Sequence, residues 1–516
     1  MRKVLLLLAL SSLLSLSSCQ SFIKLDKTDY IKTSSFEEIK KDEEGEGYYR
    51  IKEYQPLSYG NDGKTINSLR DIYSSGVAHY NAPATGKIYA LVIPVNFLDS
   101  DASDNKKQET IIHNAFFGIK ERTRFESLSS FYDYSSYGQL EFTGMVTKHY
   151  TYPYQSTELG NGTSSISSKV AGSALKWFYD TYLDVDKEQF DSDHDNNIDA
   201  LFIVYNHQKS DSPNSLWWAY CDHMSRSIGG NVNAPYGSSY AWISYDFLDG
   251  KNNYAETHVG IHESGHIFGL ADYYNTNSGA LYQPTGYVDM MDRNIGDHTG
   301  YSKMLLDWTT PYVANGDGKI TLKPFSTSGD LLLIPTNKGW NKTPYDEYLL
   351  LEYYTPTGMN ANDAGTKYSY LDKNNEKQIF TFLKEPGLKV YHVDSRVGYF
   401  DSMFSHNLLA IIGDDDELEK ISGRSSYCLD FVYNNTISDS KAKTDPVLYH
   451  LLERSGENTL INGKPFESES LFKKGDSFGI DTFKDFVFDN GSKLTYTFKI
   501  DEMSKDGITI SFDKIK

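Results

Sequence analysis

Cysteine is scarce in this chain, with three copies in 516 residues. After Cys19 only Cys221 and Cys428 remain, and their separation in sequence does not indicate whether they lie close enough to pair. Basic residues are also in deficit, since 50 Lys and Arg stand against 70 Asp and Glu, for a formal net charge of −20. This balance argues against nucleic acid as a partner, because phosphates require a basic surface. The negative net charge would help a site to attract cations.

Long apolar runs are absent after residue 20, so no later segment is expected to cross a bilayer. The sequence also has no internal repeat of fixed period and no long low-complexity tract. Hydrophobic residues make up 39% and charged residues 23%, which is typical of globular rather than disordered proteins. At 516 residues the chain is too long for one ordinary core, so two or three domains are expected.

The first residues are interpreted as a targeting segment. Arg2 and Lys3 precede the apolar run 4–16, which is too short to remain as a membrane span. The run ends in Leu-Ser-Ser-Cys at residues 16–19, which resembles the bacterial lipobox, where the cysteine is lipidated. Acyl chains on Cys19 would anchor the protein stably. We predict a signal peptide over 1–18 and a lipoprotein at the extracellular face of a bacterial membrane; an ordinary cleaved signal is the alternative.

The rest of the chain divides into three stretches. Residues 19–86 are polar and are interpreted as a tether or a pro-segment. Residues 87–312 are expected to contain strands at 88–97, 137–144 and 200–205 and helices at 127–134, 165–184 and 255–270. Residues 313–516 alternate strand-like runs with turn signals, and strands are expected at 331–335, 348–354, 387–393, 486–488, 494–500 and 508–512.

The segment most informative about chemistry is His-Glu-Ser-Gly-His-Ile-Phe-Gly-Leu-Ala-Asp at residues 262–272. On a helix, His262 and His266 lie one above the other and can present both imidazoles to one ion about 2 Å away. Glu263 is one step around the helix, within reach of a water on that ion. Gly269 allows a sharp turn after the helix, so that the chain can deliver Asp272 as a third ligand. Three protein ligands and one open position are the pattern of catalytic zinc.

Zinc in such a site lowers the pKa of its bound water, and Glu263 is placed to act as the general base. The alternative is a helix whose histidines are merely surface or core residues. Its apolar flanks indicate burial, however, and buried imidazoles need partners. Downstream, Met290 or Met291 could lie beneath the metal ligands. His298 and Tyr301 could help to stabilise an oxyanion, whereas His258 is interpreted as structural.

A second metal signal lies upstream of the strand expected at 200–205. Alternating oxygen ligands match the early positions of a calcium-binding EF-type loop: Asp191, Asp193, Asp195, Asn197 through its carbonyl, and Asp199. Asn196 stands where glycine is usual, and Phe202 stands where the bidentate glutamate would be. The motif is therefore incomplete. It predicts Ca²⁺ that pins a loop near the cleft, and a solvated acidic loop is the alternative.

Taken together, these motifs resemble the immune inhibitor A family of bacterial zinc metallopeptidases. The resemblance covers residues 87–512 with gaps, and its most specific part is the motif at 262–272 with Tyr273-Tyr274 after it. Further matching stretches are 91–97, 127–144, 191–204, 289–291, 302–308, 348–353 and 387–394. Asp307 departs from the glycine usual before Trp308. The resemblance implies a metzincin-like α+β fold, with an α/β-type zincin catalytic domain of mixed sheet and active-site helix over 87–312, followed by an all-β region over 313–516.

The resemblance also implies roles for individual residues. By position, His262, His266 and Asp272 would bind Zn²⁺, Glu263 would be the general base, and Met291 would be the Met-turn residue. Family members carry pro-segments that block the cleft, which makes residues 20–85 a candidate. The predicted function is a lipid-anchored extracellular endopeptidase that acts on proteins or peptides, with Zn²⁺ and a second predicted ion, Ca²⁺. A zinc hydrolase of a non-peptide substrate and a degenerate surface binding protein are the alternatives.

Overall fold

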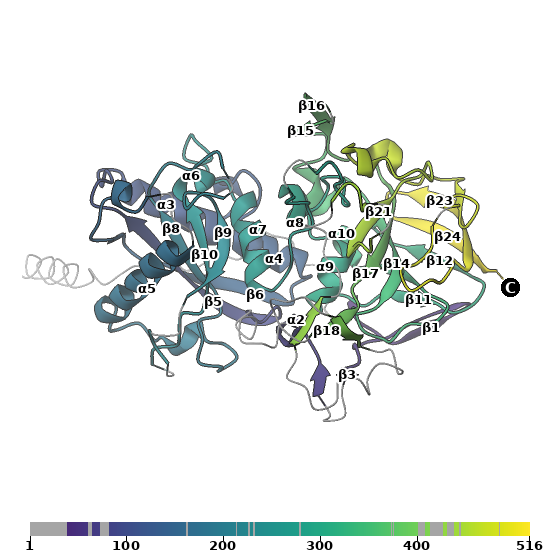
Figure 1. Ribbon diagram of the computed structural model, residues 1–516, viewed down its shortest axis with the longest axis horizontal. Helices are drawn as coiled ribbons and strands as arrows, with labels where there is room; N and C mark the ends of the chain where they lie inside the picture. Colours follow the sequence, from purple (N-terminus) through teal and green to yellow (C-terminus); the bar gives the residue numbers. More distant parts are fainter. Residues whose placement is uncertain are drawn as a thin grey trace, which may run out of the picture.

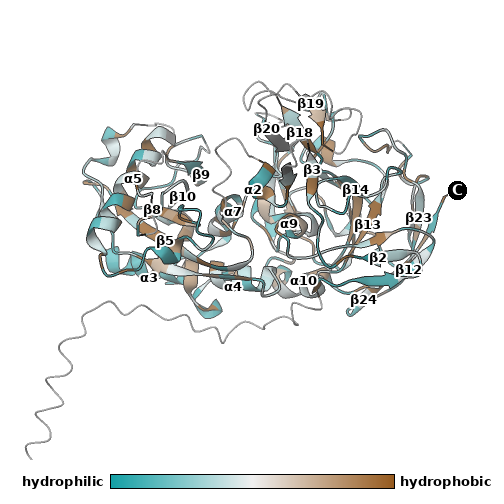
Figure 2. Ribbon diagram, turned by 90° about the horizontal axis from the view of Figure 1, so that it is seen from below, coloured by the Kyte–Doolittle hydropathy of each residue, from teal (hydrophilic) through white to brown (hydrophobic). Residues whose placement is uncertain are grey.

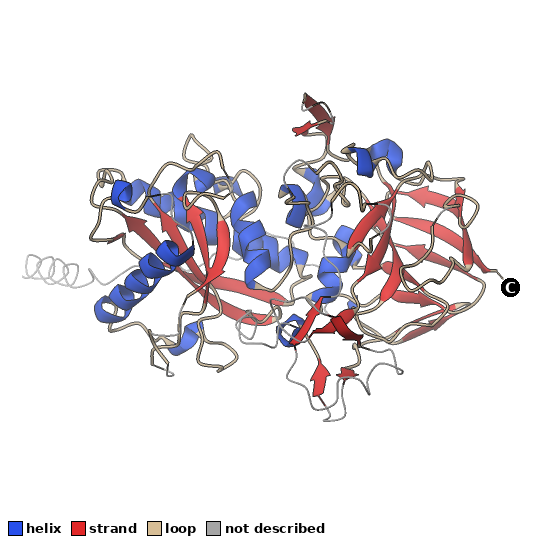
Figure 3. Cartoon of the chain, viewed as in Figure 1, coloured by secondary structure: helices blue, strands red, loops and turns tan. Residues whose placement is uncertain are grey.

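The structure is a computed structural model that describes residues 39–59, 64–72, 82–160, 164–212, 214–224, 228–230, 233–277, 280–372, 374, 376–400, 408–412, 427–430, 438–442, 445–484 and 486–515. The predicted signal peptide and Cys19 lie outside these residues. None of the described helices is long and apolar enough to cross a membrane. The chain folds as a mixed α/β protein with several sheets, arranged in two bodies that lie side by side (Figures 1 and 3).

The first body is a six-stranded sheet with helices on both faces (Figure 3). The strands lie in the order β6-β5-β8-β10-β9, and β7 also pairs with β5. Every pairing is parallel except that of β9 with β10, which is antiparallel. The strands are β5 (Gly86–Asn96), β6 (Leu140–Val146), β7 (Tyr150–Thr151), β8 (Leu201–Tyr205), β9 (Tyr220–His223) and β10 (Ser239–Ser244). The helices are α3 (Asn105–Phe117), α4 (Leu128–Ser135), α5 (Ser164–Thr181), α6 (Tyr245–Leu248) and α7 (His258–Ile267), with 3₁₀ turns at Lys120–Arg122, Ser156–Glu158 and Glu188–Phe190.

Strand β5 shows why a strand of this sheet has an almost uninterrupted run of apolar residues. Alternate residues such as Leu91 and Val92 pack on opposite faces, Leu91 in a core with α5 and Val92 in a core with α3, α4 and α7. Both faces are therefore buried, as is usual for parallel strands. Pro94 is tolerated because its nitrogen faces the gap between β6, which pairs up to Val92, and β7, which pairs from Val95.

The second body is built from two packed sheets. A seven-stranded sheet has the order β1 (Glu43–Gly45), β2 (Tyr48–Arg50), β11 (Tyr312–Ala314), β13 (Leu331–Pro335), β14 (Glu347–Tyr354), β17 (Gly387–Asp394) and β21 (Tyr449–Leu452). A four-stranded sheet has the order β12 (Gly318–Leu322), β24 (Gly507–Lys514), β23 (Tyr496–Ser504) and β22 (Ser477–Phe478). Apolar side chains of both sheets form one core between them. Figure 2 shows the hydrophobic stretch of β13 in brown.

Smaller elements complete the second body and join it to the first. The minor strands are β3 (Leu57–Tyr59) with β4 (Lys64–Ile66), β15 (Lys367–Leu371) with β16 (Lys377–Thr381), and β18 (Val397–Phe400) with β19 (Leu408–Ile411) and β20 (Tyr427–Asp430). The helices are α2 (Leu69–Ile72), α8 (Met290–Arg293), α9 (Gly300–Leu305) and α10 (Phe325–Ser328), with 3₁₀ turns at Gly358–Ala361, Leu460–Asn462 and Ser468–Ser470. Helices α8 and α9 lie between the bodies, and one hydrophobic cluster runs through both (Figure 1).

Two expectations about this part of the chain compare directly with the structure. The strand expected at 486–488 is wrong, because these residues form a loop that buries Phe488 in the core between the two sheets, with its ring 5.6 Å from that of His392 in β17. Residues 43–50 of the expected tether or pro-segment form β1 and β2, and β2 pairs with β11. Arg50 is buried there and donates to Thr310 Oγ1 at 3.2 Å. The described part of the 19–86 stretch is thus packed into the fold.

Candidate metal centre

Helix α7 carries the first two candidate ligands and is held firmly at its centre and at its end. The hydroxyl of Tyr132, from α4, donates to Ile261 O at 3.0 Å and lies 2.7 Å from Ser264 Oγ. At the C-terminus Gly269 adopts a φ of 98°, the left-handed conformation that favours glycine. The amides of Gly269 and Leu270 then donate to the carbonyls of His266 and Gly265, at 2.9 and 3.0 Å. This Schellman-type end reverses the chain, as the sequence predicts.

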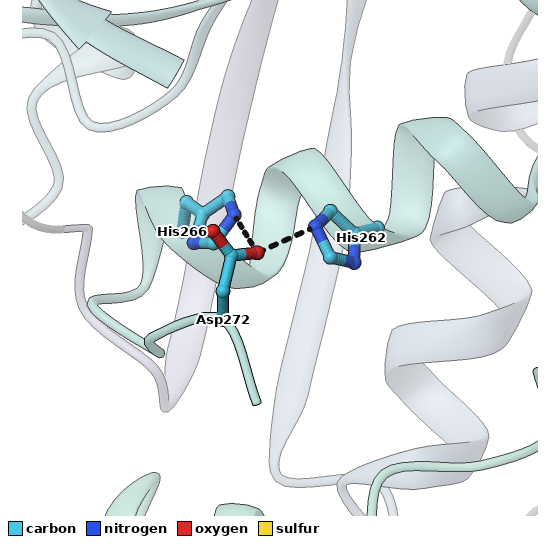
Figure 4. Close-up of side chains that lie close together, drawn as sticks. All are labelled: His262, His266 and Asp272. Carbon is cyan, nitrogen blue, oxygen red and sulfur yellow. Dashed lines mark hydrogen bonds and ion pairs between the residues drawn. The ribbon is translucent and has the colours of Figure 1, made fainter. Parts of the chain in front are cut away.

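The reversal brings Asp272 back to the two histidines (Figure 4). Asp272 Oδ1 lies 3.2 Å from His262 Nε2 and 3.2 Å from His266 Nε2. The two imidazole centroids are 4.9 Å apart and their planes are perpendicular. The three residues predicted as zinc ligands therefore converge, with their ligand atoms within 4.8 Å of one another.

Each imidazole is oriented by a backbone carbonyl on its other nitrogen. His262 Nδ1 donates to Met290 O at 2.9 Å, and His266 Nδ1 donates to Leu270 O at 2.8 Å. Such bonds fix the ring and point Nε2 toward a metal in many zinc sites. Two imidazole nitrogens and one carboxylate oxygen are also the donor types that suit Zn²⁺. The residues present therefore fit a zinc ion.

The charges in the cluster are strongly coupled. Burial lowers the pKa of His266, but the Asp272 carboxylate outweighs it and the net pKa rises to about 9. Burial in turn raises the pKa of Asp272, yet the two imidazoles hold it well below its usual range. A cation is thus stabilised at this point of the structure. A divalent metal would replace the protons shared among these three side chains.

Glu263 lies beside the ligands and is 5% exposed. Its Oε2 is buried and has no hydrogen-bond partner among the described residues. Burial raises the pKa of the Glu263 carboxyl above its ordinary value, and the nearby imidazoles only partly oppose this. The group is therefore poised to take up a proton, as a general base requires.

The cluster opens into a cleft of about 830 Å³. Its lining includes the three candidate ligands, Glu263 and the edge strand β9. Within the described chain β9 pairs with β10 alone, so its outer edge is available for hydrogen bonds. No described residue before Trp218 lines the cleft, so the described part of the 19–86 stretch does not block it. Cys221, in β9, is a free thiol whose Sγ lies 2.9 Å from Glu263 O.

Met291 lies directly beneath α7. A Cβ added at Gly265 would stand 2.5 Å from Met291 Sδ, so the absence of a side chain in the helix permits this contact. Asp289 holds the turn, because its carboxylate accepts from Met291 N at 2.7 Å and from Thr299 Oγ1 at 2.9 Å. Met290 contributes its carbonyl to His262 instead. Both methionines are fully buried, and the Met-turn role of Met291 stays a prediction.

The oxyanion roles considered for His298 and Tyr301 are wrong. Both side chains are 1% exposed and neither lines the cleft. Burial lowers the pKa of His298 to about 3, so its ring is neutral, and it packs against Phe131 and Trp308. His258 is structural, as expected: its Nδ1 lies 2.5 Å from Glu256 Oε1.

The sequence reasoning missed Tyr274. This residue lines the cleft, its ring centroid is 6.3 Å from that of His262, and its hydroxyl hydrogen-bonds to Asp272. Burial and the nearby carboxylates raise its pKa, so the phenol stays protonated and able to donate. The signals in the sequence were its position two residues after Asp272 and its place in the stretch that resembles the family's motif.

The acidic loop at 191–199 also brings carboxylates together, since ligand atoms of Asp191, Asp193 and Asp199 lie within 4.8 Å. The guanidinium of Arg70, from α2, forms ion pairs with Asp193 and with Asp195, the latter at 2.8 Å. Asn197 Oδ1 is buried without a hydrogen-bond partner among the described residues, and its backbone amide donates to Asp195. Arg70 thus holds two of the predicted ligands, and Ca²⁺ at this loop stays a prediction.

A third group in the described chain joins Glu347, His392 and Asp489 within 4.8 Å. Glu347 already accepts from His392 Nε2 at 2.9 Å and from the amide of Asn490 at 3.0 Å. The Arg396 guanidinium lies 3.8 Å from its second oxygen. Donors and a positive charge on the same carboxylate disfavour a cation, so we interpret this group as a structural network.

No protein-family model matches the chain, and no curated protein sequence matches it significantly. The resemblance to the immune inhibitor A family therefore stays a prediction.

Proposed function

We propose that the protein is a zinc-dependent endopeptidase, exported and anchored to a bacterial membrane by lipid on Cys19. The observation that carries the proposal is the convergence of His262, His266 and Asp272 in the lining of a cleft to which Glu263 also contributes. In this proposal residues 87–312 form a metzincin-like catalytic domain and residues 313–516 a β-rich C-terminal domain. The resemblance to the immune inhibitor A family supports the same reading.

Zn²⁺ bound by the three side chains would supply a water of lowered pKa and a positive charge next to the scissile carbonyl. Glu263 takes the proton of the attacking water, because no described residue hydrogen-bonds to its buried Oε2 and its pKa is raised. The same carboxyl then donates the proton to the leaving amine. Met290 O and Leu270 O hold the imidazoles in place throughout.

The cleft favours a polypeptide substrate over a small one. Strand β9 borders it with one free edge, along which an extended peptide can add as a further strand. Backbone hydrogen bonds of this kind recognise peptides irrespective of most side chains. A non-peptide substrate would leave this edge unused. The intact metal ligands and Glu263 also disfavour a degenerate binding protein.

The decisive experiment combines metal analysis with proteolysis. Purified protein is expected to contain one zinc per chain by mass spectrometry and to cleave casein in a zymogram until a chelator is added. Glu263→Ala should keep the zinc and lower cleavage roughly 10²–10⁴-fold, because general-base catalysis contributes about that much. His266→Ala should lose both the zinc and the activity.

His194→Gln is the matched control, because this histidine is exposed and lies outside the cleft. It should behave as the unchanged protein does. Zinc-loaded protein that cleaves neither casein nor gelatin would refute the peptidase proposal. Cleavage that persists in Glu263→Ala would refute the role of Glu263.

A further inference from the structure

The β15–β16 hairpin brings the second body to the rim of the cleft. Among the described residues that line the cleft, Leu371 alone comes from beyond residue 294. It is the last residue of β15, and the hairpin projects from the second body next to α8 (Figure 1). The side wall of the cleft therefore depends on both bodies.

The hairpin is fixed on its inward face. The Arg293 guanidinium, from α8, donates to Ser369 O at 2.9 Å, and the Tyr368 hydroxyl donates to Asp363 Oδ1 at 3.0 Å. The ring of Tyr287 packs 5.8 Å from Tyr370, between centroids. The ring of Phe380, in β16, also packs 5.7 Å from Tyr287, between centroids. Contacts of both strands therefore hold the ribbon at a defined place and orientation.

The outward face of the hairpin carries two exposed aliphatic side chains beside Ser369 and Lys377, and one of them, Leu371, lines the cleft. Leu371 is 55% and Ile379 is 66% exposed. Leu371 pairs with Lys377 and Ser369 pairs with Ile379, so the two aliphatic side chains are diagonal neighbours on one face. A rigid ribbon that exposes aliphatic side chains beside a cleft provides a surface for an apolar group.

We infer that the β15–β16 hairpin is a substrate-binding wall, and that Leu371, with Ile379 beside it, binds a large apolar side chain of the polypeptide that occupies the cleft. The inference rests on the proposed function and names a preference of the same site. The occupant is the substrate because Leu371 lines the same cavity as Glu263 and the metal ligands. Leu371 acts by binding and takes no part in the proton transfers.

The test is a cleavage profile on a fluorogenic peptide library with Leu371→Ser. Unchanged protein should prefer peptides with a large apolar residue, such as leucine, at one fixed position from the scissile bond. For those peptides the variant should show kcat/KM lowered roughly tenfold, chiefly through KM, because a remote apolar contact contributes mainly to binding. For the matched peptides with alanine at that position the variant should change little.

Leu183→Ser is the matched control, since Leu183 is 76% exposed and does not line the cleft. Zinc content and unfolding midpoint should be the same in all three proteins. Binding of the leucine peptides to Glu263→Ala protein, with and without Leu371→Ser, gives a readout independent of turnover. If Leu371→Ser keeps the full leucine preference, this inference is wrong while the peptidase proposal stands. If unchanged, zinc-loaded protein cleaves no peptide, the proposed function itself fails.

Discussion

At the scale of single residues, Gly265 shows how closely helix α7 packs on the turn that carries Met291. An added Cβ would stand 2.5 Å from Met291 Sδ and 3.0 Å from Met291 Cε. Because Met291 is fully buried, it cannot move aside without displacing the turn that carries Met290 O. The glycine therefore supports the orientation of His262, although it has no side chain that could bind a metal.

We expect Gly265→Ala to destabilise the protein by about 1–3 kcal/mol, because overpacking of a filled core outweighs the better helix propensity of alanine. The measurement is urea unfolding of zinc-free protein. Gly260→Ala, in the same helix, is the control. Its added Cβ would meet Leu128 Cδ1 at 3.3 Å, a much longer approach than the 2.5 Å at Gly265, so the change should be smaller. Equal effects of the two substitutions would contradict this explanation.

Residue spacing alone brought the candidate ligands together but could not sort the residues around them. His262, His266 and Asp272 were predictable because helix geometry and a glycine-bounded end fix their relation locally. His298 was misjudged because its burial depends in part on Phe131 of α4, which is distant in sequence. Tyr274 was missed because the direction of a side chain after a turn depends on the surrounding fold.

At the scale of elements, periodicity predicted the long buried segments well. The expected strands and helices at 88–97, 165–184 and 331–335 correspond to β5, α5 and β13. Short strands such as β1 and β15 were missed, since their polar or exposed residues give no pattern until a partner strand is known. The apolar residues at 486–488 suggested a strand, because a buried loop and a buried strand can have the same apolar composition.

The acidic loop and α2 form an element-scale test of the calcium prediction. Arg70 holds Asp193 and Asp195, so Ca²⁺ must displace its guanidinium to reach Asp193. A partly exposed ion pair contributes about 1 kcal/mol or less, so we expect Arg70→Ala to tighten Ca²⁺ binding roughly threefold to fivefold. Isothermal titration calorimetry with CaCl₂ measures this.

The control is Asp191→Asn in the Arg70→Ala background, which should abolish the gain because Asp191 is one of the three converging carboxylates. Absence of Ca²⁺ binding to both Arg70 forms at millimolar concentration would favour the solvated acidic loop instead.

At the scale of the whole molecule, the two bodies are joined by contacts that no local pattern reveals. One hydrophobic cluster spans both. Within the second body, β2 pairs with β11 across more than 260 residues of sequence. Asp363 is a further link. It accepts from Gly296 N at 2.8 Å and from Tyr368, and it lies 3.3 Å from His258 Nε2 at the start of α7. Asp363 thus connects the start of α7 directly to the second body.

This link predicts how stability depends on pH. Burial lowers the pKa of His258, but Asp363 and Glu256 together raise it from 6.5 to about 9. The charged imidazole therefore stabilises the folded state fully below pH 6.5, and this contribution is lost as the pH rises through about 9. The shift corresponds to at most roughly 3 kcal/mol. The pKa of Glu256 falls to about 2 despite its burial. Its carboxylate therefore stabilises the folded state fully above pH 4.5, and this contribution is lost only as the pH falls below that value.

We expect His258→Gln to lower the free energy of unfolding at pH 6.0 and to have little effect at pH 9.5, where the imidazole is neutral in both states. Zinc-loaded protein in urea is the appropriate sample, since bound metal keeps His262 and His266 from titrating. The difference between the two proteins then isolates His258 from other groups, and exposed His194→Gln controls for loss of a histidine as such. A difference that is constant from pH 6.0 to 9.5 would show that His258 contributes by packing on Phe125, whose ring centroid is 4.4 Å away, and not by its charge.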